Sequence, residues 1–546
     1  MTTPTALETD PVVVIGAGPV GQSAALLLAR WGVPVTVLDA RPRRDLIGSK
    51  AICQQRDVLD IWEAVGAGRR ISDAGVTWDV ARTYYRDREL ICQTFTDRGR
   101  SLFPPFVNIS QSRTEEILDE QIAAVASVDV RWAHEVIDVV QDRDGVTIRC
   151  RTPDGAGALR ASYVIACAGA RGDEVRQMLG LSFDGRSFDD HFLICDIRAD
   201  LGHWANERRF FFDPEWNPGR QVLIHPCPDS TFRIDWQVPA DFDLDAERDS
   251  GALDHRIRQI VGGHPYEVVW SSVYRFHARR VDRMRVGRVL VAGDLAHLVA
   301  PFGARGLNSG VADVENAAWK IAFALRGWAP PAVLDSYHTE RIAAADENLA
   351  VTSATMDFLV PQTEASRLRR TDVLRRALTD PAARAEVDSG RLCEPFWYVD
   401  SPLTTPHPSR VLPGRPSRGQ DPPVVPGVLV PDVPVTVDGA PGVSRLREIV
   451  RDGILVLTTG EVAAVKAGAN RGTGAPVRAL ALPDIDPTGL LTAAIEAGPG
   501  EAWVIRPDGH VAAVVDSGDG PAVSAAVRRA LGFTAGASAP PARARA

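Results

Sequence analysis

The N-terminal part of the chain contains an apolar run, a glycine-rich turn, a helix-like segment and a second apolar run. Residues 12–15 are all β-branched and apolar, which is typical of a strand buried in a parallel sheet. Residues 23–30 have the composition of a helix, and residues 35–38 form the second apolar run, which ends at Asp39. This order predicts a strand, a helix and a second, parallel strand.

Three glycines in the predicted turn, Gly16, Gly18 and Gly21, make a GxGxxG motif. Gly16 allows a tight turn, Gly18 allows the backbone to approach a pyrophosphate, and Gly21 allows the helix to pack closely on the strand. The helix N-terminus offers N–H groups to the phosphates, and Asp39 can accept both hydroxyls of an adenosine ribose. The motif predicts NAD(P) or FAD; a purely structural glycine turn is the weaker alternative. The expected contacts also include Pro19, Ala40 and Arg41.

A second strand, loop and helix pattern lies near residue 300. Residues 289–292 form another apolar run, and Gly293 and Asp294 follow at its end, where ligands bind in open α/β sheets. Apolar residues then recur at helical spacing, so we predict a long helix that begins near Gly306. The loop has neither the Lys-Ser/Thr of a P-loop nor the spacing of a metal site, and we expect no metal.

Two stretches in the middle of the chain read as strands. Residues 129–166 carry the turn sequences DRDG and PDGAG, which predict a small meander. Residues 186–275 are strand-like and rich in aromatic residues, so we expect an antiparallel sheet. For any single aromatic residue, a place in the core is the simpler interpretation.

The C-terminal part differs from the rest of the chain in its composition and its pattern of apolar residues. Residues 406–432 are dense in proline and predict an extended linker. Short strand and helix patterns follow, and residues 536–546 are predicted to be a disordered tail. No cysteine follows Cys393, so this region cannot perform thiol redox chemistry.

Length and composition limit the possible classes of protein. The 546 residues exceed one hydrophobic core and suggest about three or four domains. The net charge of −9 implies no bulk attraction to nucleic acid or to an anionic membrane, and we interpret the basic cluster at residues 41–44 as solvated. Seven scattered cysteines without a CxxC pair indicate a reducing compartment. The sequence shows no secretory leader and no membrane-length apolar run, so we expect a cytoplasmic protein.

The stretch GDLAHLVAPFGARGLNSGVADVENAAWK, which starts at Gly293, resembles the second FAD fingerprint of the class A flavoprotein aromatic hydroxylases. The resemblance covers most of residues 10–365 and is strongest to the branch with the phenol, hydroxyphenylpropionate and related hydroxylases. It implies an α/β fold with a Rossmann-like FAD-binding domain of the p-hydroxybenzoate hydroxylase type, an antiparallel substrate-binding sheet, a helical segment with the linker, and a thioredoxin-like domain that lacks CxxC. The expected boundaries, in that order, are residues 10–185 with 276–365, 186–275, 366–430 and 431–535.

The resemblance also implies an activity. It indicates an FAD-dependent monooxygenase that takes electrons from NADPH or NADH and hydroxylates a phenolic or related aromatic substrate with O₂. In the family, a flavin C4a-hydroperoxide delivers one oxygen atom to the ring. Epoxidation or Baeyer–Villiger insertion by the same flavin chemistry, and a flavin-binding protein without turnover, are the alternatives. The expected partner is a small aromatic molecule, and a homo-oligomer, dimer or higher, is left open.

Several residues take flavin roles by this resemblance. Asp294 is expected to bond a ribityl hydroxyl of FAD, and Pro301 to border the place where oxygen reacts. His297 is interpreted as a packing residue. The loop backbone and the following helix N-terminus are expected to approach the isoalloxazine ring. The residues expected there or as further flavin contacts are Gly303, Gly306, Leu307, Asn308, Gln111 (in a Gln-x-x-x-Glu pair with Glu115) and Gly169.

Two positions depart from the family pattern. Ala168 replaces the aspartate of an Asp-Gly motif linked to FAD and the nicotinamide, although Gly169 and Arg176 match. Asp173 is nearby in the sequence. Ile52 occupies the position of an acid that helps to activate phenol in the phenol hydroxylases, so substrate deprotonation must be arranged differently.

The candidates for the substrate pocket come from the aromatic-rich stretch. They are His225, Arg233, Asp235 and Tyr274. Arg56 is a further candidate that would steer an anionic substrate, with a surface salt bridge as the alternative interpretation.

Overall fold

The structure, a computed structural model, describes residues 6–45, 51–95, 99–416, 420–440, 442–471 and 473–533. A six-stranded sheet forms the centre of the N-terminal part, and all its strand pairs are parallel except β18–β19. Every residue of β1 and β2 is buried, as their unbroken apolar runs predict. The strand order is β18 (Arg285–Val286), β19 (Val289–Val291), β12 (Val164–Ala166), β1 (Val12–Ile15), β2 (Val35–Leu38) and β8 (Val128–Arg131).

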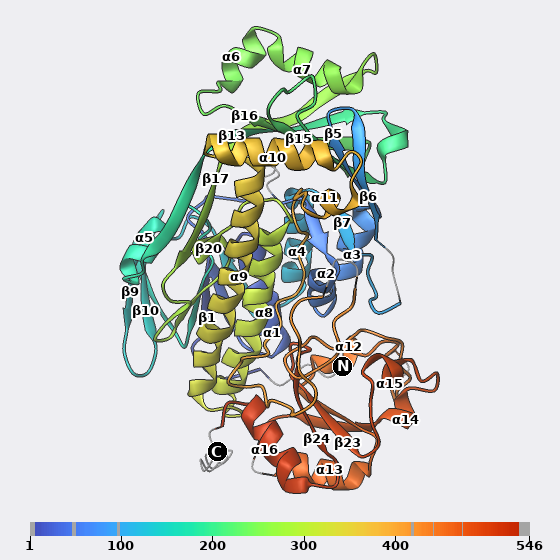
Figure 1. The fold of residues 1–546 in the computed structure, drawn as a ribbon. Helices are drawn as coiled ribbons and strands as arrows, with labels where there is room; N and C mark the ends of the chain where they lie inside the picture. The colour runs from blue at the N-terminus through green and yellow to red at the C-terminus, as the bar shows by residue number, and fades with distance from the viewer. Residues whose placement is uncertain are drawn as a thin grey trace.

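Helices pack against this sheet and against one another. Helix α1 (Pro19–Arg30) contacts both α4 (Gln111–Ala123) and α8 (Arg305–Leu325), and α8 runs beside α9 (Asp335–Leu359) through the middle of the molecule (Figure 1). Helix α1 begins at Pro19 rather than at residue 23, because a proline fits the first helical position. No helix within the described ranges is long and apolar enough to cross a membrane.

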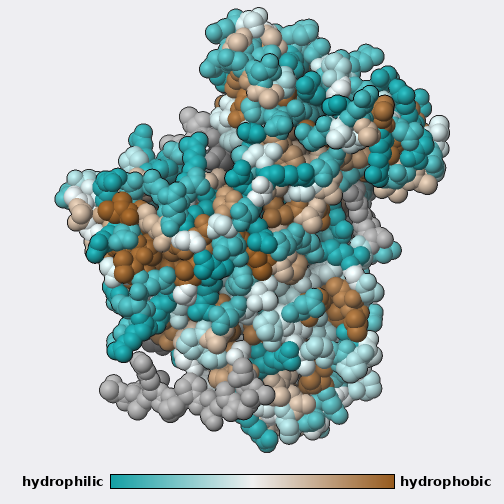
Figure 2. Space-filling model, turned by 60° about the vertical axis from the view of Figure 1, so that its left-hand side comes forward, coloured by the Kyte–Doolittle hydropathy of each residue, from teal (hydrophilic) through white to brown (hydrophobic). Residues whose placement is uncertain are grey.

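The predicted meander is confirmed for residues 135–161, whereas the two ends of the predicted range, β8 and β12, belong to the six-stranded sheet because they pair with β2 and β1. Strands β9 (Glu135–Gln141), β10 (Val146–Thr152) and β11 (Gly155–Ala161) form a three-stranded antiparallel sheet. Two apolar side chains of β9, Ile137 and Val140, are 39% and 48% exposed. The face of the molecule in Figure 2 is mostly hydrophilic with scattered apolar patches.

The second large sheet has eight strands, and it extends beyond the expected residues 186–275. The hairpin β5–β6 joins one edge, because β5 pairs in parallel with β14. One face of the sheet packs on α7 (Ala252–Val261) through a purely apolar cluster that includes Trp236 and Ile257 (Figure 1). The strand order is β20 (His297–Leu298), β17 (Tyr266–Val281), β13 (Phe183–Ala199), β16 (Thr231–Val238), β15 (Gln221–Cys227), β14 (Glu207–Phe212), β5 (Val80–Tyr85) and β6 (Arg88–Thr94).

Helices α10 (Glu364–Arg376) and α11 (Pro381–Ala385) lead into the extended segment. The predicted linker, residues 406–432, is packed on its neighbours, since Val425 and Val428 are buried in one cluster with Trp397. The C-terminal unit then forms a sheet in the order β22 (Val477–Ala481), β21 (Ile454–Thr458), β23 (Glu501–Ile505), β24 (Val511–Asp516). Helices α13 (Val462–Ala469) and α16 (Gly520–Ala530) pack against that sheet and against each other. The predicted tail at residues 536–546 lies outside the described residues.

Buried ion pairs join the C-terminal unit to the N-terminal part. Arg506, with no exposed surface, donates to Glu340 of α9 at 2.6 and 3.0 Å and to Asp508 at 2.6 and 3.1 Å. Glu340 also accepts a hydrogen bond from Lys320 of α8 at 2.6 Å, and Asp508 accepts one from the indole of Trp319 at 3.1 Å. These contacts fix the C-terminal unit against α8 and α9.

Candidate functional site

The first glycine turn has the geometry that its motif predicts. Gly16 has φ +103, and a Cβ there would lie 2.5 Å from the Cys167 carbonyl oxygen. A Cβ on Gly21 would lie 1.9 Å from the Gly16 carbonyl oxygen, so only glycine lets α1 pack on the turn. A Cβ on Gly18 would have no neighbour within 4 Å. The backbone at the N-terminus of α1 is therefore accessible to a phosphate group.

Asp39 lies at the end of β2, next to this turn. Its carboxylate accepts hydrogen bonds from the Ala17 and Arg41 backbone N–H groups at 2.8 and 2.9 Å, and from the Arg41 guanidinium at 2.9 Å on each oxygen. Burial alone would raise the pKa of Asp39, but these bonds outweigh it and hold the pKa below its usual value. A ribose would have to take the places of the Arg41 side chain, which is 36% exposed.

One of the arginines that we interpreted as solvated is largely buried. The Arg44 side chain is 10% exposed and donates to the Ala17 carbonyl at 3.0 Å and to Glu115 at 2.9 Å. Gln111 donates to the other oxygen of Glu115 at 2.8 Å and accepts from the Ala51 backbone at 3.2 Å. The interpretation of the 41–44 cluster was therefore wrong for Arg44, because its long side chain folds back onto the glycine turn and an acid of α4.

The second glycine loop is held by a buried network under β19. Asp313 accepts from the Gly293 backbone at 3.0 Å, bonds His297 at 2.7 Å and accepts from Arg341 at 2.6 Å. His297 is therefore a buried partner of Asp313. Asp294 is exposed between buried neighbours and lies beside the first turn of α8, since a Cβ on Gly306 would be 3.9 Å from its Oδ1.

The start of α8 connects this loop to β3 (Cys53–Gln55). The helix begins at Arg305 after Ala304, which has φ +57, and Gly303 has φ +106. Asn308 accepts from the Gln55 backbone and donates to the Cys53 carbonyl, both at 3.0 Å, so its side chain braces the turn. Leu307 is partly exposed beside it. Pro301 is exposed, whereas its neighbour Phe302 is buried.

The loop with the altered Asp-Gly motif packs on both glycine loops. Arg176 is buried, donates to the Leu295, Asp294 and Ala170 carbonyls, and pairs with Asp173 at 2.6 Å. Asp173 points outward, with its side chain 75% exposed. Gly169 has φ +73, as a turn at this point requires. Arg176 thus ties the motif to the loop that carries Asp294.

The inner face of the eight-stranded sheet, defined as the face opposite α7, brings the four pocket candidates together. Arg233 lies directly across from His225 on one side and from Asp196 on the other, and Asp235 is two residues along the same strand. Because alternate residues of a strand share a face, Asp235 lies on the face of Arg233. Tyr274 of β17 lies across from Phe192 of β13, which is four residues before Asp196 and therefore on the same face. Arg56 is elsewhere, at the start of α2 (Arg56–Glu63), where its role stays a prediction.

Aromatic contacts place this inner face against the second glycine loop. Phe302 stands 5.4 Å from Phe192 and 6.2 Å from Phe210 between ring centroids. An apolar cluster also joins Ile52 with Ala304 and with Cys227 of β15. The sheet face, the α8 N-terminus and the Ile52 segment therefore border one region.

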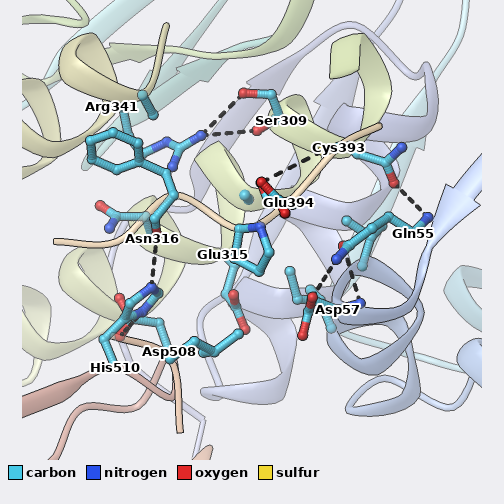
Figure 3. A pocket seen from close by; sticks show the side chains of 18 of the residues that line it. Gln55, Asp57, Ser309, Glu315, Asn316, Arg341, Cys393, Glu394, Asp508 and His510 are labelled. Carbon is cyan, nitrogen blue, oxygen red and sulfur yellow. Dashed lines mark hydrogen bonds and ion pairs between the residues drawn. The ribbon is translucent and has the colours of Figure 1, made fainter. Parts of the chain in front are cut away.

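A cavity lies between α2, α8, α9 and the C-terminal unit, and Gln55 and Asn308 line the end of it next to the start of α8 (Figure 3). Glu315 and Asn316 from α8, Arg341 from α9, and His510 line it. Its charged groups are paired, with Arg451 donating to Glu315 at 2.8 Å and Arg341 bound to Asp313. None of the four pocket candidates lines this cavity, and we assign it to the packing of the C-terminal unit.

Comparisons with known proteins agree with this geometry. The family described as "FAD binding domain" matches residues 9–352. A 3-(3-hydroxy-phenyl)propionate/3-hydroxycinnamic acid hydroxylase of Mycobacterium sp. (strain JLS) is 31% identical over 339 residues, 61% of this chain and 57% of that protein. The chain therefore spans little more than half the length of that relative. A dialkyldecalin synthase of Streptomyces rugosporus is 30% identical over 462 residues, 83% of this chain and 88% of that protein.

A likeness in three dimensions covers nearly the whole chain. The crystal structure of the flavin-dependent monooxygenase PieE in complex with FAD and substrate matches with a TM-score of 0.82. The match covers 96% of this chain and 100% of that one at 23% sequence identity, which shows a shared fold.

Proposed function

The chain belongs to the FAD binding domain family, and from this premise we propose that it is an FAD-dependent monooxygenase. The proposed reaction uses NADPH or NADH and O₂ to hydroxylate a phenolic or related aromatic substrate. One observation carries the proposal: the loop that bears Asp294 and the N-terminus of α8 border the sheet face that bears His225, Arg233 and Asp235. A flavin ring and a flat substrate would meet there.

FAD, when bound, accepts electrons from a nicotinamide and activates O₂. The described residues fit it. The open backbone at Gly18 would receive the pyrophosphate, Asp39 the ribose, and Asp294 the ribityl chain. The N-terminus of α8 would stabilise negative charge on the ring. The buried aromatic residues around Phe302 would keep water from the reacting atoms.

We propose a structural role for the C-terminal unit. Its sheet order β22-β21-β23-β24, with β21 and β22 parallel and the other pairs antiparallel, supports a thioredoxin-like fold. No cysteine follows Cys393, so this unit would hold α8 and α9 in place rather than carry electrons.

We expect Asp294→Ala to weaken FAD binding while the protein stays folded. The variant removes one hydrogen-bond acceptor for a ligand hydroxyl, which costs on the order of 1–3 kcal/mol. Titration of apoprotein with FAD, followed by flavin fluorescence, measures the change. The control is Asp335→Ala, whose side chain is 78% exposed. Equal FAD affinity in the Asp294 variant and the control would refute the role of Asp294.

We also expect an aromatic substrate to accelerate NAD(P)H oxidation at least about tenfold, equivalent to about 1.4 kcal/mol of barrier. Arg176 still joins the altered motif to the loop of Asp294, so reduction of the flavin should remain coupled to substrate in spite of Ala168. A screen of phenolic acids and polyphenols for stimulated NADPH and NADH oxidation provides the measurement. Oxidation that is equally fast without any aromatic compound would contradict this expectation.

The dialkyldecalin synthase relative favours a second candidate function, because its match covers 83% of this chain. In that case the protein would be a synthase of a dialkyldecalin. Oxygen incorporation coupled to NAD(P)H consumption separates the two candidates, since the proposed monooxygenase requires both.

A further inference from the structure

Asp235 is a charged side chain in an apolar part of the inner sheet face. The residues across from it on the neighbouring strands are Leu223 and Ile194, both buried. On the strand beyond Leu223, Phe210 occupies the same row and belongs to the aromatic cluster around Phe302. Burying a carboxylate among apolar side chains costs free energy, so packing does not explain why an aspartate is at this position.

The nearest arginine of this face already has a different partner. Arg233 donates to both oxygens of Asp196, on the adjacent strand β13, at 2.8 Å each, so the ion pair is bidentate. The Oδ1 atom of Asp235 is buried and has no hydrogen-bond partner among the described residues. The Nδ1 atom of His225 is in the same situation, one strand away. The side-chain amide of Gln221, on the same face of β15, also has no partner among the described residues. Buried polar atoms are rarely left unpaired, so such a group on one face indicates a ligand with a polar group.

We propose that Asp235 accepts the proton of a substrate hydroxyl on an aromatic ring, with His225 holding the same hydroxyl. This proposal rests on the proposed function and deepens it, because it defines the substrate as a phenol whose hydroxyl points at the sheet. The phenolic O–H bond breaks and a carboxyl O–H bond forms on Asp235. The electron pair left on the phenolate oxygen spreads to the ring carbons ortho and para to it, which makes them better targets for an electrophilic oxygen.

The charges that face Asp235 are consistent with this task. Burial raises the pKa of Asp235 to about 7, an effect that Arg233 and Arg208 oppose and Asp196 increases. Burial, with Arg208 and Arg233, lowers the pKa of His225 well below its usual value, so this ring stays neutral. Further titratable groups on this side include Cys227 of β15, with its pKa raised to about 12 by burial, and Tyr274 of β17, with its pKa also raised by burial. A general base works best with a pKa near the working pH.

Opposite the sheet face, Ile52 and Ala304 belong to an apolar cluster that also contacts Cys227 of β15. None of the described residues of this cluster is an acid. A phenol placed between this cluster and the sheet would find its carboxylate at Asp235.

Binding of 4-nitrophenol to the FAD-loaded protein tests the proposal without requiring turnover. In mildly alkaline buffer both the free phenol and Asp235 are largely ionised, so a complex that shares one proton must take up about one proton. Calorimetric titration in buffers of different ionisation enthalpy should show this uptake for the unchanged protein and for Asp189→Asn, whose side chain is 76% exposed. Asp235→Asn should show none. Lack of binding, lack of uptake, or equal uptake in Asp235→Asn would overturn the proposal.

Turnover gives a second measurement. With 3-(3-hydroxyphenyl)propionate, whose hydroxyl is not ionised at neutral pH, Asp235→Asn should form product at least about 100-fold more slowly. The rate of the unchanged protein should rise as the pH increases through about 7, because only ionised Asp235 accepts a proton, and the variant should lose this rise. Bound FAD should be equal in both proteins.

The two hypotheses fail in different ways. Proton uptake on phenol binding without oxygen incorporation would support the role of Asp235 and refute the monooxygenase assignment. Oxygen incorporation without proton uptake would refute the role of Asp235 and support the monooxygenase assignment.

Discussion

Gly21→Ala is expected to lose bound FAD and a large part of its stability, whereas Gly18→Ala should lose only FAD. A methyl group on Gly21 would lie 1.9 Å from the Gly16 carbonyl oxygen, so the backbone of the turn must shift. Such overpacking costs about 3 kcal/mol of the free energy of unfolding. A methyl group on Gly18 meets nothing within 4 Å, and its φ of −75 suits any residue. It would obstruct only a ligand that approaches the N-terminus of α1.

Denaturant unfolding of the two apoproteins and FAD titration test this pair. The apo form is needed because bound FAD would itself add to stability. We expect Gly18→Ala to unfold within about 0.5 kcal/mol of the unchanged protein. Its FAD affinity should fall at least about tenfold, or about 1.4 kcal/mol. Equal destabilisation of the two variants, or full FAD affinity in Gly18→Ala, would contradict the geometry of the turn.

Arg506→Met is expected to destabilise the protein by about 3–5 kcal/mol at neutral pH, because breaking a buried ion pair leaves charge without compensation. The variant removes four hydrogen bonds to Glu340 and Asp508, both of which are buried. Burial alone would raise the pKa of Glu340, but Arg506 and Lys320 outweigh it and hold the pKa well below its usual range. Without Arg506 this effect weakens.

The pH dependence follows from the sign of that shift. A depressed carboxyl pKa contributes stability above the unfolded-state value, near 4.3 for glutamate, and this stability is lost as the pH falls through the folded-state value. In Arg506→Met the acids can be protonated at a higher pH, so the difference between variant and unchanged protein should shrink from neutral pH toward about pH 5. Denaturant unfolding at both pH values checks this, with the 91% exposed Arg143→Met as control. A loss below about 1 kcal/mol would show that the cluster does not hold the C-terminal unit.

The local parts of the fold could be predicted from the sequence. Strands β1 and β2 follow from two unbroken apolar runs, and the turn after β1 follows from glycines at positions where a side chain would clash. The long helix after Gly303 follows from apolar spacing. These features depend on neighbours within a few residues, which the sequence displays directly.

The long-range parts could not be predicted in this way. The parallel pairing of β5 with β14 joins segments far apart in the chain, and no turn signal marks it. The sequence predicts that Arg44 lies on the surface, because its partner Glu115 is brought next to it only by the fold. The four pocket candidates could be named singly, but strand register decides that they share one face and that Arg233 pairs with Asp196 rather than Asp235.

Isotope labelling of the product tests the central claim most directly. The purified, FAD-containing protein is supplied with NADPH or NADH, heavy-isotope O₂ and each aromatic compound that accelerates oxidation. The account predicts a hydroxylated product in which the added hydroxyl carries one heavy oxygen atom, with the other recovered in water. A product without heavy oxygen, or recovery of all the consumed O₂ as hydrogen peroxide across the whole screen, would contradict the account.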